Sequence, residues 1–261
     1  MVVDLEKIDT YVQLSEQLIA TQDELIKLIS YIDLTSLNND DTEQTIIDLC
    51  QMAQTPYGNV AAVCVYSQFV NIAKQYLADT GIKIATVCNF PSGNQTPDII
   101  YQEIEKAIAD GANEIDMVMP HHKYAIGETQ STIDLVKTAK QLCGPEILLK
   151  VILEINKLFD VHVIHQASCN IIAAGADFIK TSTGKMTPGA TPEGAWAMLY
   201  AIKLSGKSHV GFKAAGGVRE VSQALLYKAI SKHLLGQAWV TPKHFRLGAS
   251  QLLPNILAKL T

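Results

Sequence analysis

The sequence predicts an α/β protein, a (β/α)8 TIM barrel with an additional N-terminal helix over about residues 5–28. Glycines recur at positions 58, 81, 111, 144, 175, 206 and 236, mostly after a helix-like segment and before a β-rich run. That interval fits a repeated βα unit of about 30 residues. The length of 261 residues and the 48% hydrophobic content suit one large core, so a single domain over residues 1–261 is expected.

The elements follow the same pattern along the chain. Strands are expected near residues 31–35, 60–66, 82–89, 114–119, 147–154, 177–181, 209–214 and 244–248, with helices between them. In residues 97–111 the apolar positions fall at helical spacing, and Gly111 suits the left-handed residue that ends a helix. A doubly wound open sheet is the rival, but no G-x-G-x-x-G follows the first strand.

Composition limits the partners and the compartment. The net charge of −5 disfavours nucleic-acid and anionic-membrane partners, although a small anionic substrate is compatible. The five cysteines are odd in number, scattered and without a C-x-x-C pair, which favours reduced thiols in the core over disulfides or zinc ligands. The N-terminus has no signal-peptide pattern, and no apolar run approaches about 18 residues, so a cytoplasmic protein is expected.

Two lysines each end an apolar run before a glycine-containing turn. They are Lys180 and Lys213, on the sixth and seventh predicted strands. A buried lysine is costly unless it is paired or has lost its proton, and one alone is more often a structural ion pair. Two on successive strands favour a functional site, because strand C-termini face the active-site mouth of such a barrel.

The spacing of the two strands suggests how one lysine becomes reactive. Neighbouring strands lie about 4.8 Å apart, so two inward ammonium groups approach to about 5 Å. At an effective dielectric near 20, their repulsion is about 3 kcal/mol, which lowers one lysine pKa by roughly two units. A neutral amine near pH 7 is a nucleophile suited to Schiff-base chemistry.

Other polar residues interrupt the apolar strands. Asp116 faces inward by parity with Val118 and is a candidate proton-transfer group, or alternatively a carboxylate that only balances the lysines. For Asp33, Lys150 and Glu154 two interpretations are about equally favoured, since each either lines a site or balances the charge of neighbouring groups. Together these residues predict a polar barrel centre, which is typical of a working site.

Phosphate binding is predicted at the turns after the last three strands. Such turns often hold phosphate through backbone N–H groups and helix N-termini. The candidate residues are Gly184, Lys185, Gly216, Gly217, Gly248 and Ser250. Each glycine turn is a weak signal alone, and Thr183–Met186 is not a P-loop, because Met186 occupies the Ser/Thr position.

Metal chemistry is poorly supported by the histidines. His121 and His122 are sequence neighbours, and His162 and His165 form only an i, i+3 pair without a metalloprotease glutamate. Solvent-facing histidines are expected instead.

Along almost its whole length the chain resembles deoxyribose-phosphate aldolase. The segments that carry the resemblance are 33–38, 63–66, 85–91, 114–116, 149–154, 177–185, 211–219 and 245–250. The resemblance implies a class I aldolase in which Lys180 forms a Schiff base, while Asp116 and Lys213 handle protons. It also implies that Asp33, Lys150, Cys64 and Thr181 line the site.

What the resemblance implies about function is the reversible cleavage of 2-deoxyribose 5-phosphate to glyceraldehyde 3-phosphate and acetaldehyde, in deoxyribose catabolism. No metal or cofactor is required, because the lysine supplies the electron sink. The expected partners are small phosphorylated sugars and aldehydes, and a homodimer is compatible with the sequence.

Some positions depart from the family pattern, and other functions stay open. Ala214 stands where the family commonly has proline, and Ile155-Asn156 stand where it has Thr-Gly. The chain ends at Thr261 without the polar tail of some relatives, so no role of a tail is expected. The alternatives are another Schiff-base barrel aldolase, transaldolase-like or specific for keto acids, and a catalytically silent phosphate-binding barrel.

Overall fold

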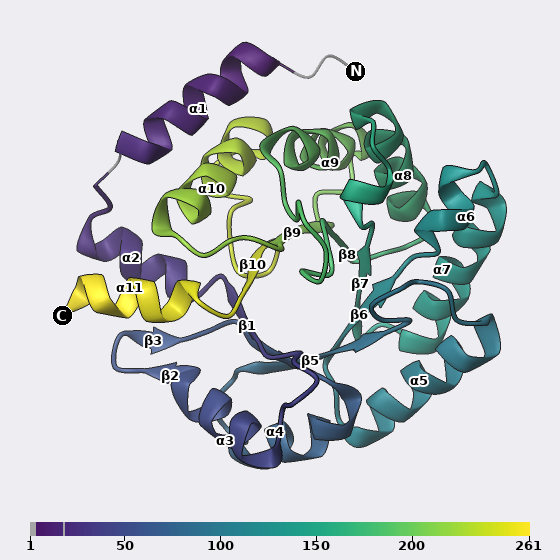
Figure 1. Ribbon diagram of the computed structural model, residues 1–261, viewed down its shortest axis with the longest axis horizontal. Helices are drawn as coiled ribbons and strands as arrows, with labels where there is room; N and C mark the ends of the chain where they lie inside the picture. Colours follow the sequence, from purple (N-terminus) through teal and green to yellow (C-terminus); the bar gives the residue numbers. More distant parts are fainter. Residues whose placement is uncertain (1–3, 18) are drawn as a thin grey trace.

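A computed structural model describes residues 4–17 and 19–261, and its centre is a closed barrel of parallel strands (Figure 1). The order around the barrel is β1-β10-β9-β8-β7-β6-β5-β4, and β1 pairs with β4 to close it. Strands that are consecutive in the barrel are joined by helical connections that lie outside it. The predicted TIM barrel is therefore confirmed, and the doubly wound sheet is excluded.

Every predicted strand overlaps one barrel strand. The barrel strands are β1 (Ile32–Thr35), β4 (Ala62–Val65), β5 (Lys83–Cys88), β6 (Glu114–Val118), β7 (Leu148–Ile152), β8 (Phe178–Lys180), β9 (Gly211–Ala215) and β10 (Phe245–Ala249). A separate short hairpin, β2 (Gln54–Thr55) and β3 (Gly58–Asn59), follows the first connecting helix.

The helices that follow the barrel strands form the outer ring in Figure 1. They are α3 (Glu43–Met52), α4 (Val70–Tyr76), α5 (Pro97–Asp110), α6 (His121–Ala125), α7 (Thr129–Cys143), α8 (Val161–Ala173), α9 (Pro192–Ser205), α10 (Val221–Leu235) and α11 (Leu252–Leu260), with 3-10 turns at η1 (Ser67–Phe69) and η2 (Ile155–Lys157). Gly111 ends α5 in the left-handed conformation, as the sequence predicted.

The predicted N-terminal helix is confirmed, but its extent over about residues 5–28 was wrong, because the segment forms two helices. α1 (Leu5–Gln17) and α2 (Gln22–Ile29) are separate, and position 18 lies outside the described residues. Thr21 starts the second helix because its hydroxyl accepts the Glu24 N–H while the Glu24 carboxylate accepts the Thr21 N–H. This capping box gives the chain a strong local signal for a new helix at that point.

Side chains alternate between two environments along each strand. The outward residues, such as Ile115 and Met117 on β6, join the large apolar core between barrel and helices. The inward residues of β6 are Glu114 and Asp116, and both are buried. The barrel interior is therefore charged, while the main hydrophobic core lies around it.

An aromatic side chain lies across the interior next to these charged groups. Phe178 points inward from β8, and the guanidinium of Arg246 lies 5.7 Å from the centre of its ring. Gly211 on β9 leaves room for that ring, because a Cβ atom there would overlap it. Phe178 thus gives Arg246 a cation–π partner as well as an apolar neighbour.

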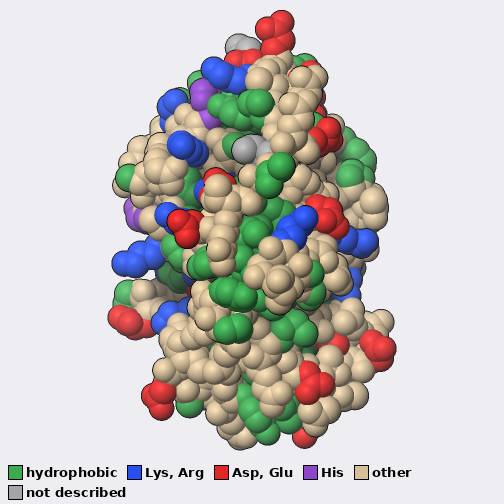
Figure 2. Space-filling model, turned by 90° about the vertical axis from the view of Figure 1, so that its left-hand side faces the viewer, with side chains coloured by type: hydrophobic (Ala, Val, Ile, Leu, Met, Phe, Trp, Pro, Cys, Tyr) green, Lys and Arg blue, Asp and Glu red, His purple; other side chains and the backbone are tan. Residues whose placement is uncertain are grey.

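The outer surface mixes charges of both signs. Figure 2 shows the face over α2, α11 and the β2–β3 hairpin, where acidic and basic side chains are interspersed with hydrophobic ones. No helix among residues 4–17 and 19–261 combines the length and apolar character needed to cross a bilayer.

The contact between Gly211 and Phe178 leads to a stability prediction. Gly211→Ala should lower the free energy of unfolding by about 1–3 kcal/mol, since the methyl group overlaps the aromatic ring in a closed barrel. Combining it with Phe178→Leu should recover part of the loss, because the smaller side chain vacates that space. Denaturant titration of both single variants and the double variant measures this coupling; additive effects would contradict the overlap.

Candidate active site

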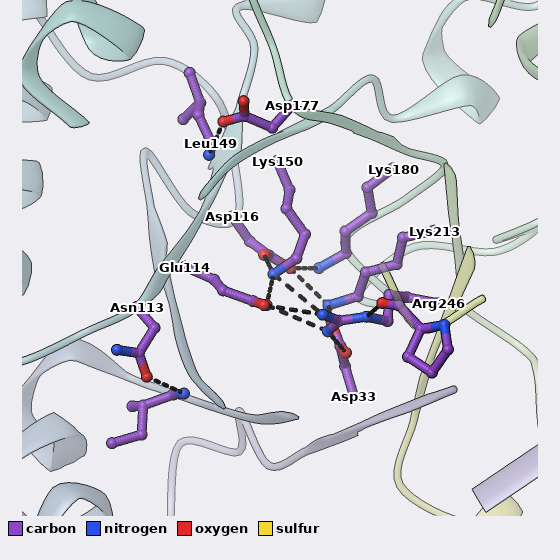
Figure 3. A network of polar contacts seen from close by, with 12 residues as sticks. Asp33, Asn113, Glu114, Asp116, Leu149, Lys150, Asp177, Lys180, Lys213 and Arg246 are labelled. Atoms are coloured by element: carbon purple, nitrogen blue, oxygen red, sulfur yellow. Dashed lines mark hydrogen bonds and ion pairs between the residues drawn. The ribbon is translucent and has the colours of Figure 1, made fainter. Parts of the chain in front are cut away.

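A network of charged side chains fills the centre of the barrel (Figure 3). Its members come from the inward positions of six strands. They are Asp33 of β1, Glu114 and Asp116 of β6, Lys150 of β7, Lys180 of β8, Lys213 of β9 and Arg246 of β10. The strand register brings them together, because Asp116 pairs with Lys150, and Lys180 with Lys213, on neighbouring strands.

Asp116 lies at the centre of three lysines. Its Oδ1 accepts from Lys150 Nζ at 2.8 Å, and its Oδ2 accepts from Lys180 Nζ at 2.7 Å and from Lys213 Nζ at 2.8 Å. The Asp116 side chain is fully buried. The structure therefore brings together the three residues that the resemblance assigned to catalysis.

A second group of charges supports these contacts from within the barrel. Arg246 donates to Asp33 Oδ1 at 2.7 Å and to Glu114 Oε1 at 3.0 Å. Lys150 also lies 2.5 Å from Glu114 Oε2, and Lys213 lies 2.5 Å from Asp33 Oδ2. Asp33 and Lys150 were predicted as site-lining or supporting residues. In the structure they mainly pair with the other charged groups of the network.

Two members of this network, Glu114 and Arg246, were not among the predicted site residues. A signal for both was present in the sequence. Glu114 lies two residues before Asp116 and so faces the same side of the strand, and Arg246 interrupts the apolar run at 245–247. Charge in an otherwise apolar strand is informative because it requires buried partners.

The surroundings shift the pKa values of the three lysines in opposite directions. Burial lowers the pKa of Lys180 below the ordinary lysine value; the Lys213 ammonium lowers it further, and Asp116 only partly offsets this. Burial acts the same way on Lys213, but Asp116 and Asp33 outweigh it and raise its pKa. Burial is likewise outweighed at Lys150, where Asp116 and Glu114 raise the pKa. Lys180 is thus the network lysine that most readily loses its proton.

The cause of this shift differs from the one argued from sequence. Lysine–lysine repulsion was the predicted main cause, but the structure places Asp116 Oδ2 against both ammonium groups. An anion between two cations reduces their net repulsion. Burial is consequently the larger cause, with Lys213 as a second contribution.

Lys180 also differs from the other cations in its position. It contacts one carboxylate among the described residues, whereas Lys150, Lys213 and Arg246 each contact at least two. It also lines a cavity of about 400 Å³ at the barrel mouth, and none of the other six network residues does. Lys180 is therefore placed to meet a bound molecule.

The same cavity brings together the predicted phosphate residues. Gly184, Lys185, Gly216, Gly217, Gly248 and Ser250 all line it, and so does Arg219, which follows the second glycine turn. Arg219 was not among the predicted phosphate-binding residues. α11 begins at Leu252, directly after this wall of the cavity. The wall combines two cationic side chains with glycine turns, which suits an anionic group.

Close backbone packing holds these turns in place. Gly184, Gly216 and Gly217 have positive φ, and a Cβ atom at Gly189 would overlap the backbone of Gly216. Ala190 N–H donates to the Gly216 carbonyl at 2.9 Å. Gly248 has a further role, because a Cβ atom there would lie 2.9 Å from Lys213 Cε. Glycine at these positions is thus required by space or by φ.

Glu154 supports the turn after β8 from the end of β7. Its side chain is buried, and Oε2 accepts the N–H of Thr183 at 3.2 Å. The Lys185 ammonium, two residues further on, donates to the Leu37 carbonyl across the cavity. Glu154 therefore positions the turn and does not line the cavity.

Two predicted lining residues lie outside the cavity. Cys64 is fully buried in a small apolar cluster with Leu37, Ala85 and Val87, and burial raises the pKa of its thiol. Thr181 is also buried, and its hydroxyl both donates to the Ala215 carbonyl and accepts the Ala215 N–H. Thr181 thus joins the ends of two strands.

The histidines match the expectation in part, since His122 and His162 are exposed. His121 is buried, and burial lowers its pKa, so the prediction of a solvent-facing residue was wrong for it. It begins the short helix α6, which packs against η2 and α7. In the described part of the chain, no three His, Cys, Asp or Glu side chains gather as metal ligands do.

The buried carboxylates lead to a prediction about acid stability. Burial by itself raises the pKa of the Asp33 carboxyl. The neighbouring cations Lys213, Arg246 and Lys150 outweigh burial and lower this pKa. Its stabilising contribution is therefore complete above the unfolded pKa of about 4 and declines as the pH falls below it. Asp33→Asn should cost about 3–5 kcal/mol at pH 7, since it removes one carboxylate partner from three buried cations.

The difference in free energy of unfolding between wild type and Asp33→Asn should narrow below pH 4, by about 1.4 kcal/mol per pH unit. Urea titrations between pH 3 and pH 7 measure it. Asp134→Asn is the control, because Asp134 is exposed and its pair with Lys137 has a distance of 3.7 Å. A gap that stays constant with pH would contradict the assigned role of Asp33.

Solved structures resemble this barrel over nearly its full length. A candidate deoxyribose-phosphate aldolase from Coccidioides immitis has 28% identity and a TM-score of 0.79, with 98% of each chain covered. A second candidate, from Toxoplasma gondii, has 24% identity and a TM-score of 0.81, covering 91% of this chain and 94% of that one. The tetrameric deoxyribose phosphate aldolase from Aeropyrum pernix has 24% identity and a TM-score of 0.74, covering 95% and 96%.

The sequence also matches a family model over most of the barrel. The match covers residues 27–241, from α2 to the connection before β10, and includes Lys180, Lys213 and Asp116. The family is described as DeoC/LacD family aldolase. With the fold and the lysine site in agreement, the chain belongs to the DeoC/LacD family of aldolases.

Proposed function

We propose that the protein is a deoxyribose-phosphate aldolase that cleaves 2-deoxyribose 5-phosphate into glyceraldehyde 3-phosphate and acetaldehyde through a Schiff base on Lys180. One observation carries this proposal. Lys180 is the network cation that lines the cavity, and burial with a neighbouring ammonium lowers its pKa. The family match and the candidate aldolase from Coccidioides immitis support the substrate assignment.

The reaction begins with neutral Lys180 attacking the C1 aldehyde of the open-chain sugar. Loss of water forms an iminium, whose positive nitrogen stays close to the Asp116 carboxylate that accepts from Lys180 in the free enzyme. The carboxylate stabilises this cation in a buried site, where electrostatic interactions are stronger than in water. No metal ion is needed at this step, because the iminium is itself the electron sink.

Cleavage of the C2–C3 bond follows removal of the proton from the C3 hydroxyl. The bonding electrons move toward the iminium and give an enamine, and glyceraldehyde 3-phosphate leaves. Burial would raise the pKa of Asp116, but its three lysine partners hold it well below the ordinary value, so Asp116 is an anion able to accept a proton. Lys213, on the same carboxylate oxygen, and a water molecule complete the route. Protonation of the enamine and hydrolysis release acetaldehyde.

The phosphate group would occupy the wall that carries Gly184, Lys185, Gly216, Gly217, Gly248 and Ser250. Lys185 supplies charge, while the glycine turns let backbone N–H groups approach an oxygen closely. Arg219 adds a second cation to the same wall. Since Lys180 lines the same cavity, a sugar phosphate can reach both ends.

We further propose that residues 1–261 act as one aldolase domain in the cytoplasm, in the breakdown of deoxyribose phosphate. All five cysteines are free, which fits a reducing compartment. A homodimer remains our proposal for the assembly, although the Aeropyrum pernix structure is a tetramer.

The first test is covalent trapping. Borohydride with acetaldehyde should leave a reduced ethyl adduct on Lys180, because this residue lines the cavity and loses its proton most readily. Lys180→Arg should abolish the adduct, since a guanidinium stays protonated. Peptide mass mapping locates the label, and labelling chiefly at Lys213 or Lys150 would overturn the assignment.

Asp116→Asn separates Schiff-base formation from bond cleavage. The amide cannot accept the C3 hydroxyl proton, so cleavage should fall by about 10²–10⁴-fold. Trapping at Lys180 should persist, because losing an anion disfavours the ammonium form. Circular dichroism checks folding, since three lysines lose a partner. Near-normal cleavage in a folded variant would remove Asp116 from the proton-transfer role.

Ser250→Asp tests the phosphate wall. Negative charge there should lower kcat/KM for 2-deoxyribose 5-phosphate by about two to four orders of magnitude, if two charge-assisted hydrogen bonds are lost. Turnover of unphosphorylated 2-deoxyribose should change little. Ser250→Asn is the matched control, because it has a similar size to aspartate without the charge. Equal losses for both sugars, or none, would place the phosphate elsewhere.

A further inference from the structure

The charged network contains more cations than anions. Lys150, Lys180, Lys213 and Arg246 face Asp33, Glu114 and Asp116, so four basic groups meet three acidic ones in contact with one another. All seven side chains are buried. An uncompensated charge in such surroundings is costly, and the excess is removed when one lysine loses its proton.

The contacts decide which lysine that is. Arg246 stays charged, and it contacts Asp33 and Glu114. Lys150 contacts Asp116 and Glu114 closely, and Lys213 contacts Asp116 and Asp33 closely. Lys180 shares one oxygen of Asp116 with Lys213. The positive charge of Lys180 is therefore the one that nearby carboxylates compensate least.

We propose that Lys150 and Glu114, which lie beneath the cavity, are positioning residues that set the protonation state of Lys180 through this charge balance. This rests on the proposed Schiff-base function of Lys180. Without the Lys150 charge, three cations would face three carboxylates, and Lys180 would have to keep its proton for neutrality. Without the Glu114 charge, four cations would face two carboxylates, and Lys180 would lose its proton at a lower pH.

Every other barrel strand except β5 contributes a titratable side chain around Lys180. β1 contributes Asp33, β4 Cys64, β6 Glu114 and Asp116, β7 Lys150, β9 Lys213 and β10 Arg246. The inward residues of β5, Ala85 and Val87, are apolar. Glu154 lies at the end of β7 on Thr183, while Lys185 and Arg219 share the cavity but are exposed to screening by water. Cys64 is a neutral thiol at neutral pH, because burial raises its pKa.

The test is the pH dependence of acetaldehyde trapping by borohydride at Lys180, read by peptide mass mapping. Lys150→Met should raise the midpoint of this profile by about one to two pH units, and Glu114→Gln should lower it by a similar amount. The double variant leaves three cations and two carboxylates, which restores the excess of one, so its midpoint should return toward wild type. Lys150→Arg keeps the charge and should leave the midpoint nearly unchanged.

The outcomes separate this proposal from the proposed function. No adduct on Lys180 in the wild-type enzyme would overturn the Schiff-base function itself. If the wild-type enzyme forms the adduct but the pH midpoint of trapping shifts in the same direction in both single variants, the charge balance alone would be overturned. The same holds if the midpoint shifts in neither variant. If circular dichroism shows that Lys150→Met does not fold, Glu114→Gln and the double variant decide, since the first must lower the midpoint and the second must restore it.

Discussion

The structure depends on the burial of charged side chains where a barrel ordinarily packs apolar ones. Burial of ionised groups is costly, and contacts between opposite charges compensate only when the geometry is close. Asp116 satisfies this condition with contacts of 2.7–2.8 Å to three lysines from three other strands. The network thus ties β6 to β7, β8 and β9, while Arg246 ties β10 to β1 and β6.

The rest of the fold accommodates this interior. The main apolar core lies between barrel and helices, where the outward strand residues pack. Small residues inside the barrel make room for the long basic side chains, as Gly248 does beside Lys213. Phe178 lies over Gly211 and beside Arg246, so an apolar group still fills the space that the ion pairs leave. Stability and reactivity therefore draw on the same arrangement.

The two sides of the cavity carry different groups. Lys180 reaches it from the charged network, and the other wall is formed by the glycine turns after β8 and β9 and by the end of β10 with Gly248 and Ser250. These turns are pinned to one another through the contact of Gly189 and Ala190 with Gly216, and to β7 through Glu154. Backbone contacts hold the proposed phosphate wall more firmly than mobile side chains could, and such preorganisation reduces the entropic cost of binding.

Much of this molecule was predictable from its sequence. The eight strands, their alternation and the inward direction of Asp116 follow from short-range periodicity, and Lys180 and Lys213 stand out because charge is rare in buried strands. The glycines at 184, 216 and 248 likewise marked the cavity wall, although Gly248 lies within β10 and not in the turn after it. The two-helix N-terminal segment shows the limit of periodicity, since a capping box at Thr21 interrupts an otherwise continuous amphipathic pattern.

Only the tertiary structure decided how the charged residues share their partners. Sequence spacing places Lys180 and Lys213 on adjacent strands, but it cannot show that Asp116 Oδ2 lies between them or that Glu114 and Arg246 join the network. It also could not show that Cys64 and Thr181 are absent from the cavity lining. Sequence by itself determined which residues face the barrel interior, because that follows from alternation along one strand. The charge state of each depends on distances between strands far apart in the chain, which only the closed barrel sets.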